Sequence, residues 1–431
     1  MKEWPDFDVP ADWSLTRMDE LAVKLKAGGT PNRKNKAFFG GDIPFVLIDD
    51  MTSSGVYLKS TKETITREGL NSSSAWIVPE NTVLLSMYAT IGATVITTFP
   101  VATNQAILAI IPNEECDREY LAFCLQAHKS HLARLNVEST QKNINKGIVS
   151  SFLVPLPPLP EQKKIAHILS TVQRAIEAQE RIIQTTTELK KAIMHKLFTE
   201  GLPRRSLGEG GPPRHEPQKQ TEIGPVPESW EVVALSECAV VQTGIAKGRK
   251  VNAEEAVEVP YLRVANVQDG YLDLSEMKTI TIRKNEQQRF ALQDGDVVLT
   301  EGGDFDKLGR GFIWHGEIEN CVHQNHVFAV RPDKEQISSE FFAYQSQSPY
   351  GKSYFLSVAH KTTNLACINT TKLKAFPVLL PPQDQQEDIV EACRSIDGKI
   401  RNATNKKNQL QDLFRTILHE LMTARIRVDV C

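Results

Sequence analysis

Two long segments of the chain repeat apolar residues at alternating steps of four and three positions. The first runs from residue 165 to residue 197 and the second from residue 389 to residue 421, and the spacing keeps its phase throughout both. This spacing places the apolar side chains in one narrow stripe along a helix, which is the pattern of a coiled coil. The stripe contains Ile165, Leu169, Val172, Ile176, Ile183, Ile193 and Leu197 in the first segment and Ile389, Ile396, Ile400, Leu410, Phe414, Ile417 and Leu421 in the second.

The two stripes keep the same phase at an offset of 224 residues, the difference between positions 389 and 165. We therefore expect the two helices to pack on each other within one chain, as an antiparallel intramolecular coiled coil. Gln179, Lys190 and Lys407 interrupt the stripes. Polar residues at such positions fix the register of some coiled coils and occupy a solvated edge in others. The sequence leaves both interpretations open.

The residues before each helical segment alternate short β-branched runs with Gly, Pro, Asn and Asp, which predicts a strand-rich domain. These two domains are copies of one another, because short motifs recur in the same order. DWSL at 12–15 returns as SWEV at 229–232, and LPPLPEQ at 156–162 returns as LPPQDQQ at 380–386. Three further motifs between them recur as well, and in each copy the Pro-Pro pair suits the approach to a first helical turn.

The predicted fold class is therefore α+β, a tandem duplication of a mixed α/β domain followed by a long helix. The segment between the copies, GLPRRSLGEGGPPRHEPQKQ, has almost no apolar residues and predicts a flexible surface linker. The expected boundaries are 1–155 for the first domain, 156–200 for the first helix, 201–221 for the linker, 222–379 for the second domain and 380–425 for the second helix.

Composition narrows the class of protein only modestly. A formal charge of −3 over 431 residues neither supports nor excludes a nucleic-acid partner, since a basic patch can be offset elsewhere. The seven cysteines are odd in number and lack C-x-x-C spacing, so we expect reduced, mostly buried thiols and a cytoplasmic location. The N-terminal MKEWPD carries acids where a signal peptide needs apolar residues. Residues 81–113 are uncharged, but their glycine, proline and short β-branched runs predict buried strands and no membrane helix.

Few groupings suggest catalysis or metal binding. Cys321, His323 and His326 have an unfavourable spacing for a tetrahedral metal site on a strand, so a structural strand end is favoured. Gly-rich turns explain the carboxylates within 294–301 better than a nuclease site does. The GKS at 351–353 lacks the first glycine and the preceding strand of a phosphate loop, and no dinucleotide-binding motif occurs. We therefore predict no catalytic residue, no metal site and no bound cofactor in this chain.

Polar loops with clustered basic residues, the first at 24–36, provide three candidate DNA-binding regions in each copy. Phosphates require local positive charge, and base edges are read by amide, hydroxyl and cationic groups. A solvated surface turn is the alternative for any single loop, and the pairing of the loops in both copies favours DNA. The candidates are Thr30, Arg33, Lys34, Lys36, Tyr88, Thr90, Thr140, Gln141, Lys142 and Asn143 in the first copy and Lys247, Arg249, Lys250, Asp304, Lys307, Arg310, Lys361, Thr362, Thr363 and Asn364 in the second.

The chain resembles the specificity (S) subunits of type I restriction-modification systems. The resemblance rests on GGTP at 28–31 with GGDIP at 40–44, on the helix entry at 156–162, on KLFT at 196–199 and on TEIGPVPESW at 221–230. The segment from Thr300 to Gly311 is similar to one variety of that family's target-recognition domain. The similarity covers essentially the whole chain and matches its duplicated layout.

This resemblance implies that each domain is a target-recognition domain that reads one part of a split, asymmetric site on double-stranded DNA. It also implies partners: two modification subunits, which bring S-adenosylmethionine and methylate adenine N6, and restriction or translocase subunits, which use ATP and Mg²⁺. The chain itself would be a non-catalytic specificity subunit and would bind none of these cofactors. A stand-alone bipartite DNA-binding regulator and a coiled-coil interaction scaffold are the alternatives.

Overall fold

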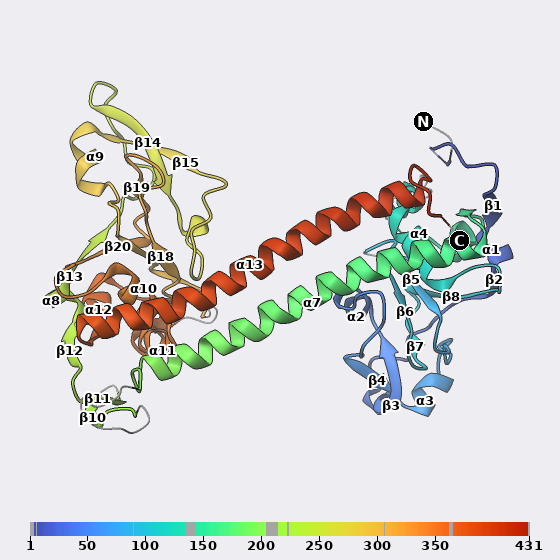
Figure 1. The fold of residues 1–431 in the computed structure, drawn as a ribbon, viewed down its shortest axis with the longest axis horizontal. Coiled ribbons are helices and arrows are strands. Elements are labelled where there is room, and N and C mark those ends of the chain that lie inside the picture. The colour runs from blue at the N-terminus through green and yellow to red at the C-terminus, as the bar shows by residue number, and fades with distance from the viewer. Residues whose placement is uncertain are drawn as a thin grey trace. The chain divides into compact units, whose positions relative to one another are not determined.

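The computed structural model describes residues 4–5, 7–88, 90–134, 143–203, 214–221, 224–305, 307–361 and 365–429. The chain divides into two compact units, the first of Met1–Ile183 with Asn402–Cys431 and the second of Gln184–Arg401. Each unit contains one domain of short strands and helices together with one part of each of two long helices (Figure 1). These helices are α7 (Leu159–Leu197) and α13 (Gln383–Met422).

The domain of the first unit consists of two small sheets and one further pair of strands. Its strands are β1 (Ser14–Arg17), β2 (Ala22–Ala27), β3 (Phe39–Val46), β4 (Glu63–Ile65), β5 (Val83–Ser86), β6 (Thr94–Ile96), β7 (Ala102–Thr103), β8 (Ile107–Pro112) and β9 (Leu153–Leu156). Its short helices are α1 (Met18–Leu21), η1 (Lys36–Phe38), α2 (Ile48–Ser53), α3 (Arg67–Asn71), α4 (Arg118–Ala127), α5 (Lys129–Arg134) and α6 (Lys146–Ser150). The sheets have the orders β2-β8-β5-β6 and β4-β3-β7, and β1 pairs with β9.

The domain of the second unit repeats this plan. Its strands are β10 (Gln218–Thr221), β11 (Gly224–Pro227), β12 (Glu231–Ala234), β13 (Ala239–Thr243), β14 (Ala256–Leu262), β15 (Lys278–Arg283), β16 (Val297–Thr300), β17 (Gly302–Gly303), β18 (Gly311–Ile313), β19 (Val322–His323), β20 (Val327–Pro332), β21 (His360–Lys361), β22 (Ala366–Cys367) and β23 (Pro377–Leu380). Its short helices are α8 (Leu235–Cys238), η2 (Val264–Asn266), α9 (Lys284–Phe290), α10 (Ser339–Gln347), α11 (Pro349–Val358) and α12 (Thr370–Lys374). The sheets β13-β20-β16-β18 and β15-β14-β19 correspond to those of the first unit, and the second unit also contains the sheet β17-β22-β21.

The register of the strands confirms the tandem duplication. Leu15 of β1 lies opposite Pro155 of β9. Val232 and Leu379, which the repeat places at the same two positions, lie opposite each other in β12 and β23. The duplication therefore extends from short sequence motifs to the hydrogen-bonding partners of the strands.

Each copy also keeps a glycine where the backbone passes very close to another strand. A Cβ atom on Gly28 would lie 1.9 Å from the carbonyl oxygen of Thr103, and one on Gly244 would lie 2.0 Å from that of His323. No side chain fits at such distances, so the chain can enter the first candidate loop of each copy along this path only with glycine.

The apolar stripes are the faces on which the long helices pack, because every predicted stripe residue is buried or half-buried. In the first unit Leu169 of α7 shares one hydrophobic core with Phe414 of α13. In the second unit Leu197 of α7 shares a core with Ile389 of α13. The beginning of each helix therefore packs with the end of the other, which confirms the predicted antiparallel pair.

Two of the polar stripe residues pair with carboxylates of the opposite helix. Lys190 Nζ lies 2.6 Å from Asp397 Oδ1, with only 16% of the lysine side chain exposed. Lys407 Nζ lies 3.9 Å from Glu180 Oε1. The second pair is ten residues back along α7 and ten residues forward along α13, as an antiparallel register requires. This pairing favours the register interpretation over the solvated edge.

The uncharged segment 81–113 forms β5 to β8, as predicted. No helix within the described ranges is both long and apolar enough to cross a membrane. At the end of the predicted linker, residues 218–221 form β10, which pairs with β11, so this part is a strand. Residues 204–213 of the linker lie outside the described residues.

The cysteines that the structure describes are free thiols, and all but Cys367 are buried. Burial raises the pKa of Cys321 to about 12 and that of Cys238 to about 11. These thiols are therefore protonated and unreactive near neutral pH, in line with the reduced, buried cysteines expected from the sequence. Cys431 lies outside the described residues.

Candidate nucleic-acid interface

The first candidate loop of the first copy joins the turn between β7 and β8, residues 103–107. The hydroxyl of Thr30 donates a hydrogen bond to Gln105 Oε1 at 2.6 Å. The backbone N–H of Gly29 donates to the carbonyl of Thr103 at 2.9 Å. Because Thr103 is buried and Gln105 is exposed, this turn presents its amide side chain to solvent beside the loop.

The same turn contacts the candidate loop after β5, and that loop in turn contacts the third candidate loop. The N–H of Met87 donates to the carbonyl of Ala106 at 2.8 Å, and the N–H of Ile144 donates to the carbonyl of Met87 at 3.1 Å. Asn143 is thereby brought next to the loop that follows β5, whereas the candidates at 140–142 lie outside the described residues. We call this assembly the first loop cluster, which consists of residues 28–36, 86–88, 90–92, 103–107 and 143–144.

The second copy repeats the arrangement around the turn that links β19 to β20. The N–H of Ile245 donates to the carbonyl of His323 at 2.8 Å, and the N–H of Glu301 donates to that of His326 at 2.9 Å. The N–H of Ile368 donates to the carbonyl of Glu301, also at 2.9 Å. Each bond has its counterpart at the repeat-related position of the first copy, so both domains gather their three candidate loops in the same way.

The sheet β17-β22-β21 joins two of these loops in the second copy. Gly302 lies opposite Cys367, and Lys361 lies opposite Ala366. The candidates at 362–364 lie outside the described residues. The second loop cluster consists of residues 244–250, 300–305, 307–310, 323–327, 360–361 and 365–368.

The first loop cluster carries two exposed lysines. Lys34 and Lys36 are exposed, and neither side chain makes an ion pair within the described part of the chain. Arg33 differs, because its guanidinium lies 3.2 Å from Glu63 Oε2 and stacks over the Phe39 ring at 5.4 Å. A phosphate would have to compete with Glu63 for Arg33, whereas the two lysines are available directly.

The prediction that residues 24–36 form a loop is wrong for their first part. Residues 22–27 are strand β2, and Lys24 and Lys26 lie over the ring of Trp76, at 4.1 Å and 5.4 Å from its centroid. The sequence AVKLKA alternates polar and apolar residues with the period of a strand, a signal that the density of lysines obscured.

Several cations of the second loop cluster are paired with neighbouring carboxylates. Arg249 donates to Glu286 at 2.7 Å, and this hydrogen bond lowers the pKa of Glu286. Lys307 pairs with Asp304 and lowers the pKa of that carboxyl in the same way. Arg310, half-buried, donates to Gln268 at 3.2 Å. The exposed lysines without an ion pair among the described residues are Lys247, Lys250 and Lys361.

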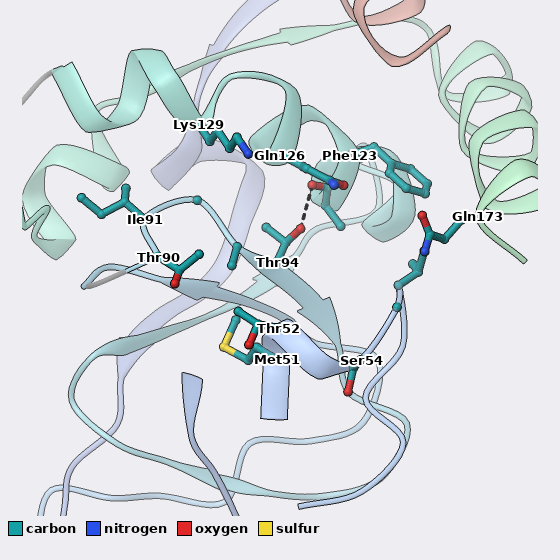
Figure 2. A pocket seen from close by; sticks show the side chains of 15 residues that line it. Met51, Thr52, Ser54, Thr90, Ile91, Thr94, Phe123, Gln126, Lys129 and Gln173 are labelled. Atoms are coloured by element: carbon teal, nitrogen blue, oxygen red, sulfur yellow. Dashed lines mark hydrogen bonds between the residues drawn. The ribbon is translucent and has the colours of Figure 1, made fainter. Parts of the chain in front are cut away.

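A polar cavity of about 230 Å³ adjoins the first loop cluster (Figure 2). Thr90 and Lys129 line it together with Gln126 and Gln173, and no carboxylate lines it. The glycine at 92 has a positive φ of 82°, and a Cβ atom there would lie 2.4 Å from the Cβ of Lys129. The candidate Thr90 therefore belongs to a tightly packed loop that rests on the start of α5.

Sequence reasoning missed the residues at the centre of each cluster. Gln105, Asn325 and His326 occupy the central turns, and the His326 side chain is 58% exposed while its Nδ1 lies 2.5 Å from Glu301 Oε2. The signal was present, because the Asn-Gln and Gln-Asn pairs at these turns are one of the recurring motifs.

Two of the residues considered for catalysis or metal binding, His323 and Asp296, are buried in the second domain. His323 is 1% exposed, its Nδ1 lies 2.7 Å from the carbonyl oxygen of Val327, and burial lowers its pKa. Asp296 is fully buried and accepts two hydrogen bonds of 2.7 Å from Arg331. Among the described residues, no group of three or more His, Cys, Asp or Glu side chains could hold a metal ion.

The fold and the site together define the class of protein. It is a duplicated recognition protein, which has one polar loop cluster in each mixed α/β domain and an antiparallel pair of helices to which both units contribute. The chain belongs to the family of the type I restriction modification DNA specificity domain. The family model matches residues 10–187 and again residues 227–412, one match for each copy. The family predicted from the sequence motifs is thereby confirmed.

Relatives and solved structures agree with this assignment. The chain is 27% identical to the type I restriction enzyme MjaVIII specificity subunit of Methanocaldococcus jannaschii, over 99% of this chain and 96% of that one. It is 23% identical to the EcoBI specificity subunit of Escherichia coli, over 97% and 88%. The crystal structure of the S subunit of a type I restriction-modification system from M. genitalium has the same fold, with a TM-score of 0.54 over 98% of both chains at 15% identity.

Proposed function

We propose that the chain is the DNA sequence-recognition subunit of a type I restriction-modification complex. Each loop cluster contacts one half of a bipartite, asymmetric DNA site. The observation that carries this proposal is the repetition of the family domain, with one polar loop cluster in each copy. Because the central turn carries Gln105 in one copy and Asn325 with His326 in the other, the two halves of the site differ in sequence.

Different side chains of the clusters contact the phosphates and the bases of the DNA. Exposed lysines such as Lys34, Lys36 and Lys250 contact phosphates, which gives affinity and orientation without sequence information. The amides of Gln105 and Asn325 suit base edges, since a side-chain amide can form two hydrogen bonds with adenine in the major groove. Their central place in the clusters supports this role.

The partners follow from the family. Two modification subunits bind S-adenosylmethionine and methylate adenine, and restriction or translocase subunits use ATP and Mg²⁺. This chain supplies recognition and holds these subunits together, and it contributes no catalytic group and binds none of their cofactors. The regulator and scaffold alternatives are less favoured, because family membership extends over both copies.

Co-expression with its modification subunit, in a host without adenine methylation, tests the proposal by mapping methylated adenines genome-wide. We expect a motif of two short blocks separated by an unread spacer. Gln105→Ala should relax one block only, and Asn325→Ala should relax the other. Glu335→Gln, at an exposed loop outside both clusters, is the control and should leave the motif unchanged.

Three results would contradict the proposal. Methylation that does not depend on this chain would remove its role in recognition. A single continuous motif, or one that both amide variants change in the same block, would refute the assignment of one half-site to each domain. Methyl transfer by the purified chain alone would show that it is catalytic.

A further inference from the structure

The central turn of the second loop cluster is held at both ends by backbone hydrogen bonds. The N–H of Val327 donates to the carbonyl of Gln324 at 2.8 Å, which closes a turn with Asn325 and His326 as its two middle residues. The N–H of Asn325 also donates to the carbonyl of Ile245 at 3.1 Å. The turn therefore fixes where these two side chains begin, and their own contacts determine which atoms they present.

Glu301 determines which nitrogen of the His326 ring carries a proton. His326 Nδ1 lies 2.5 Å from Glu301 Oε2. An ionised carboxylate can only accept a hydrogen bond, so Nδ1 carries the proton, and Nε2 of the neutral ring is an acceptor. The backbone of Glu301 is itself anchored, because its N–H donates to His326 and its carbonyl accepts from Ile368, both at 2.9 Å. The carboxylate and the ring are therefore held together as one unit.

The His326 ring in turn determines which way the Asn325 amide faces. Asn325 Nδ2 lies 3.2 Å from His326 Nε2. An amide nitrogen can only donate, which agrees with a neutral ring whose Nε2 accepts. One N–H of the amide is thereby occupied, while Asn325 Oδ1 accepts no hydrogen bond from any residue that the structure describes. The amide therefore keeps its oxygen and its second N–H available for a ligand.

The first loop cluster holds its central amide by the opposite atom. The Thr30 hydroxyl donates to Gln105 Oε1 at 2.6 Å, so there the amide oxygen is occupied. The first copy has Met87 and Ala106 at the positions of the carboxylate and the imidazole, as the matching backbone hydrogen bonds show. The two domains therefore orient corresponding amides through different contacts.

We propose that Glu301 and His326 are positioning residues that set the base preference of Asn325, and that the base read by Asn325 is adenine. This inference rests on the proposed function of the second loop cluster. In the major groove adenine presents a donor at N6 and an acceptor at N7, which match the available Oδ1 and second N–H of Asn325. With the amide turned round, only its N–H groups would be available, and these suit the two acceptors of guanine. A methylated adenine has to leave the base stack to react, so the adenine that Asn325 reads is a different one.

The carboxylate of Glu301 needs a specific role at such a surface. Its side chain is 27% exposed, so it brings negative charge to a cluster that faces phosphates, and this charge opposes binding. An exposed ion pair also contributes little to stability. Fixing the proton on His326 gives the carboxylate a role in specificity that neither affinity nor stability provides.

The test measures the preference for one base pair, using the complex of the full chain with its modification subunit. Methylation mapping with Asn325→Ala identifies the position that Asn325 reads, which should be an A·T pair in the unaltered motif. Competition binding to duplexes with A·T or G·C at that position then gives the preference. His326→Ala and Glu301→Met, which introduce the residues of the first copy, should each reduce the preference for A·T about tenfold, within the discrimination that a bidentate contact provides. Glu301→Gln keeps an acceptor for Nδ1 and should retain the preference.

His315→Ala is the matched control, because His315 Nδ1 also lies beside a carboxylate, 3.9 Å from Asp294 Oδ1, but outside the cluster. It should leave the preference unchanged. Circular dichroism checks folding, and if Glu301→Met fails that check, His326→Ala decides the outcome by itself, since the His326 side chain is 58% exposed.

Three results would overturn the inference and leave the proposed function intact. They are a G·C pair at the position that Asn325 reads, an unchanged preference in both His326→Ala and Glu301→Met, and a loss in Glu301→Gln as large as that in Glu301→Met. The last result would mean that the charge of Glu301 acts, and not its hydrogen bond to the ring. If Asn325→Ala relaxed no position of the motif, the proposed function itself would be contradicted.

Discussion

Arg427, which follows α13, forms hydrogen bonds with residues near the beginning of the first unit. Its guanidinium donates hydrogen bonds to Glu161 at 2.7 and 2.9 Å and to Asp12 at 3.1 and 2.6 Å, and it lies over the Trp13 ring at 5.7 Å. Trp13 Nε1 also donates to Glu161, at 3.2 Å. The hydrogen bonds that Arg427 donates to Glu161 and Asp12 raise the pKa of Arg427, and those donated to Asp12 lower the pKa of that carboxyl.

The second unit has an uncharged hydrogen-bonded pair at the corresponding position. Trp230, the counterpart of Trp13, donates from Nε1 to the neutral amide oxygen of Gln385 at 2.8 Å. Gln385 stands where the first unit has Glu161, and Ser229 stands where it has Asp12. The arginine is therefore needed only because the first unit buries a carboxylate. The Trp230–Gln385 pair shows that an uncharged pair fits at the corresponding position of the second unit.

Replacing Arg427 by Met keeps most of the aliphatic stem but leaves Glu161, only 3% exposed, without its counter-charge. Breaking a fully buried ion pair costs about 3–5 kcal/mol. Arg427 is 41% exposed, so water can partly replace it, and we expect a loss of about 2 kcal/mol. At about 1.4 kcal/mol for each factor of ten, local opening near Glu161 becomes about 30-fold more frequent.

Hydrogen–deuterium exchange of the α7 amides 165–172 measures this opening directly. The α13 amides 389–396 are the repeat-related control within the same molecule and should not change. The double variant Arg427→Met with Glu161→Gln copies the neutral pair of the second unit and should restore most of the protection. Unchanged exchange in Arg427→Met would refute the reasoning. Equal loss in the double variant would mean that the arginine acts through packing on Trp13 and not through its charge.

The loops, the helices and the buried histidine each lead to a further prediction. Replacing Arg33, Lys34 and Lys36 with Ala should weaken DNA binding at all sequences and flatten its salt dependence by about one unit for each phosphate that is no longer neutralised; a changed sequence preference at constant salt slope would contradict this. Inserting four residues near 185–188 adds about 6 Å of helix. If the helices set the spacing of the half-sites, methylation mapping should show a longer spacer between unchanged blocks. Because burial lowers the pKa of His323, the unfolded chain binds an extra proton below about pH 6.5. Thermal unfolding should therefore show the second unit losing stability between pH 7.5 and 5.5, and His323→Thr, the residue of the first copy, should remove that loss.

The parts of the fold that depend on local periodicity were predictable. The stripes of α7 and α13 need only the spacing of apolar residues along one helix, and the duplication needs only motifs in the same order. The strand β2 was misassigned where two lysines alternate with apolar residues, because their charge suggested a loop. These lysines lie on a strand because β2 pairs with β8, and both side chains lie over the ring of Trp76.

The sequence by itself determined the duplicated α+β architecture, the helix pair and the set of loops in which DNA contacts were expected. Only the tertiary structure decided which residues of those loops meet. Backbone hydrogen bonds such as that from Met87 to Ala106 depend on which strands pair with each other. The paired segments are far apart along the chain, so no local sequence pattern indicates the pairing. The same holds for charge: Arg33 forms an ion pair with Glu63, thirty residues away, whereas Lys34 next to it has no ion pair with any residue that the structure describes. The sequence shows how many cations there are, but the folded chain determines which of them are left for a phosphate.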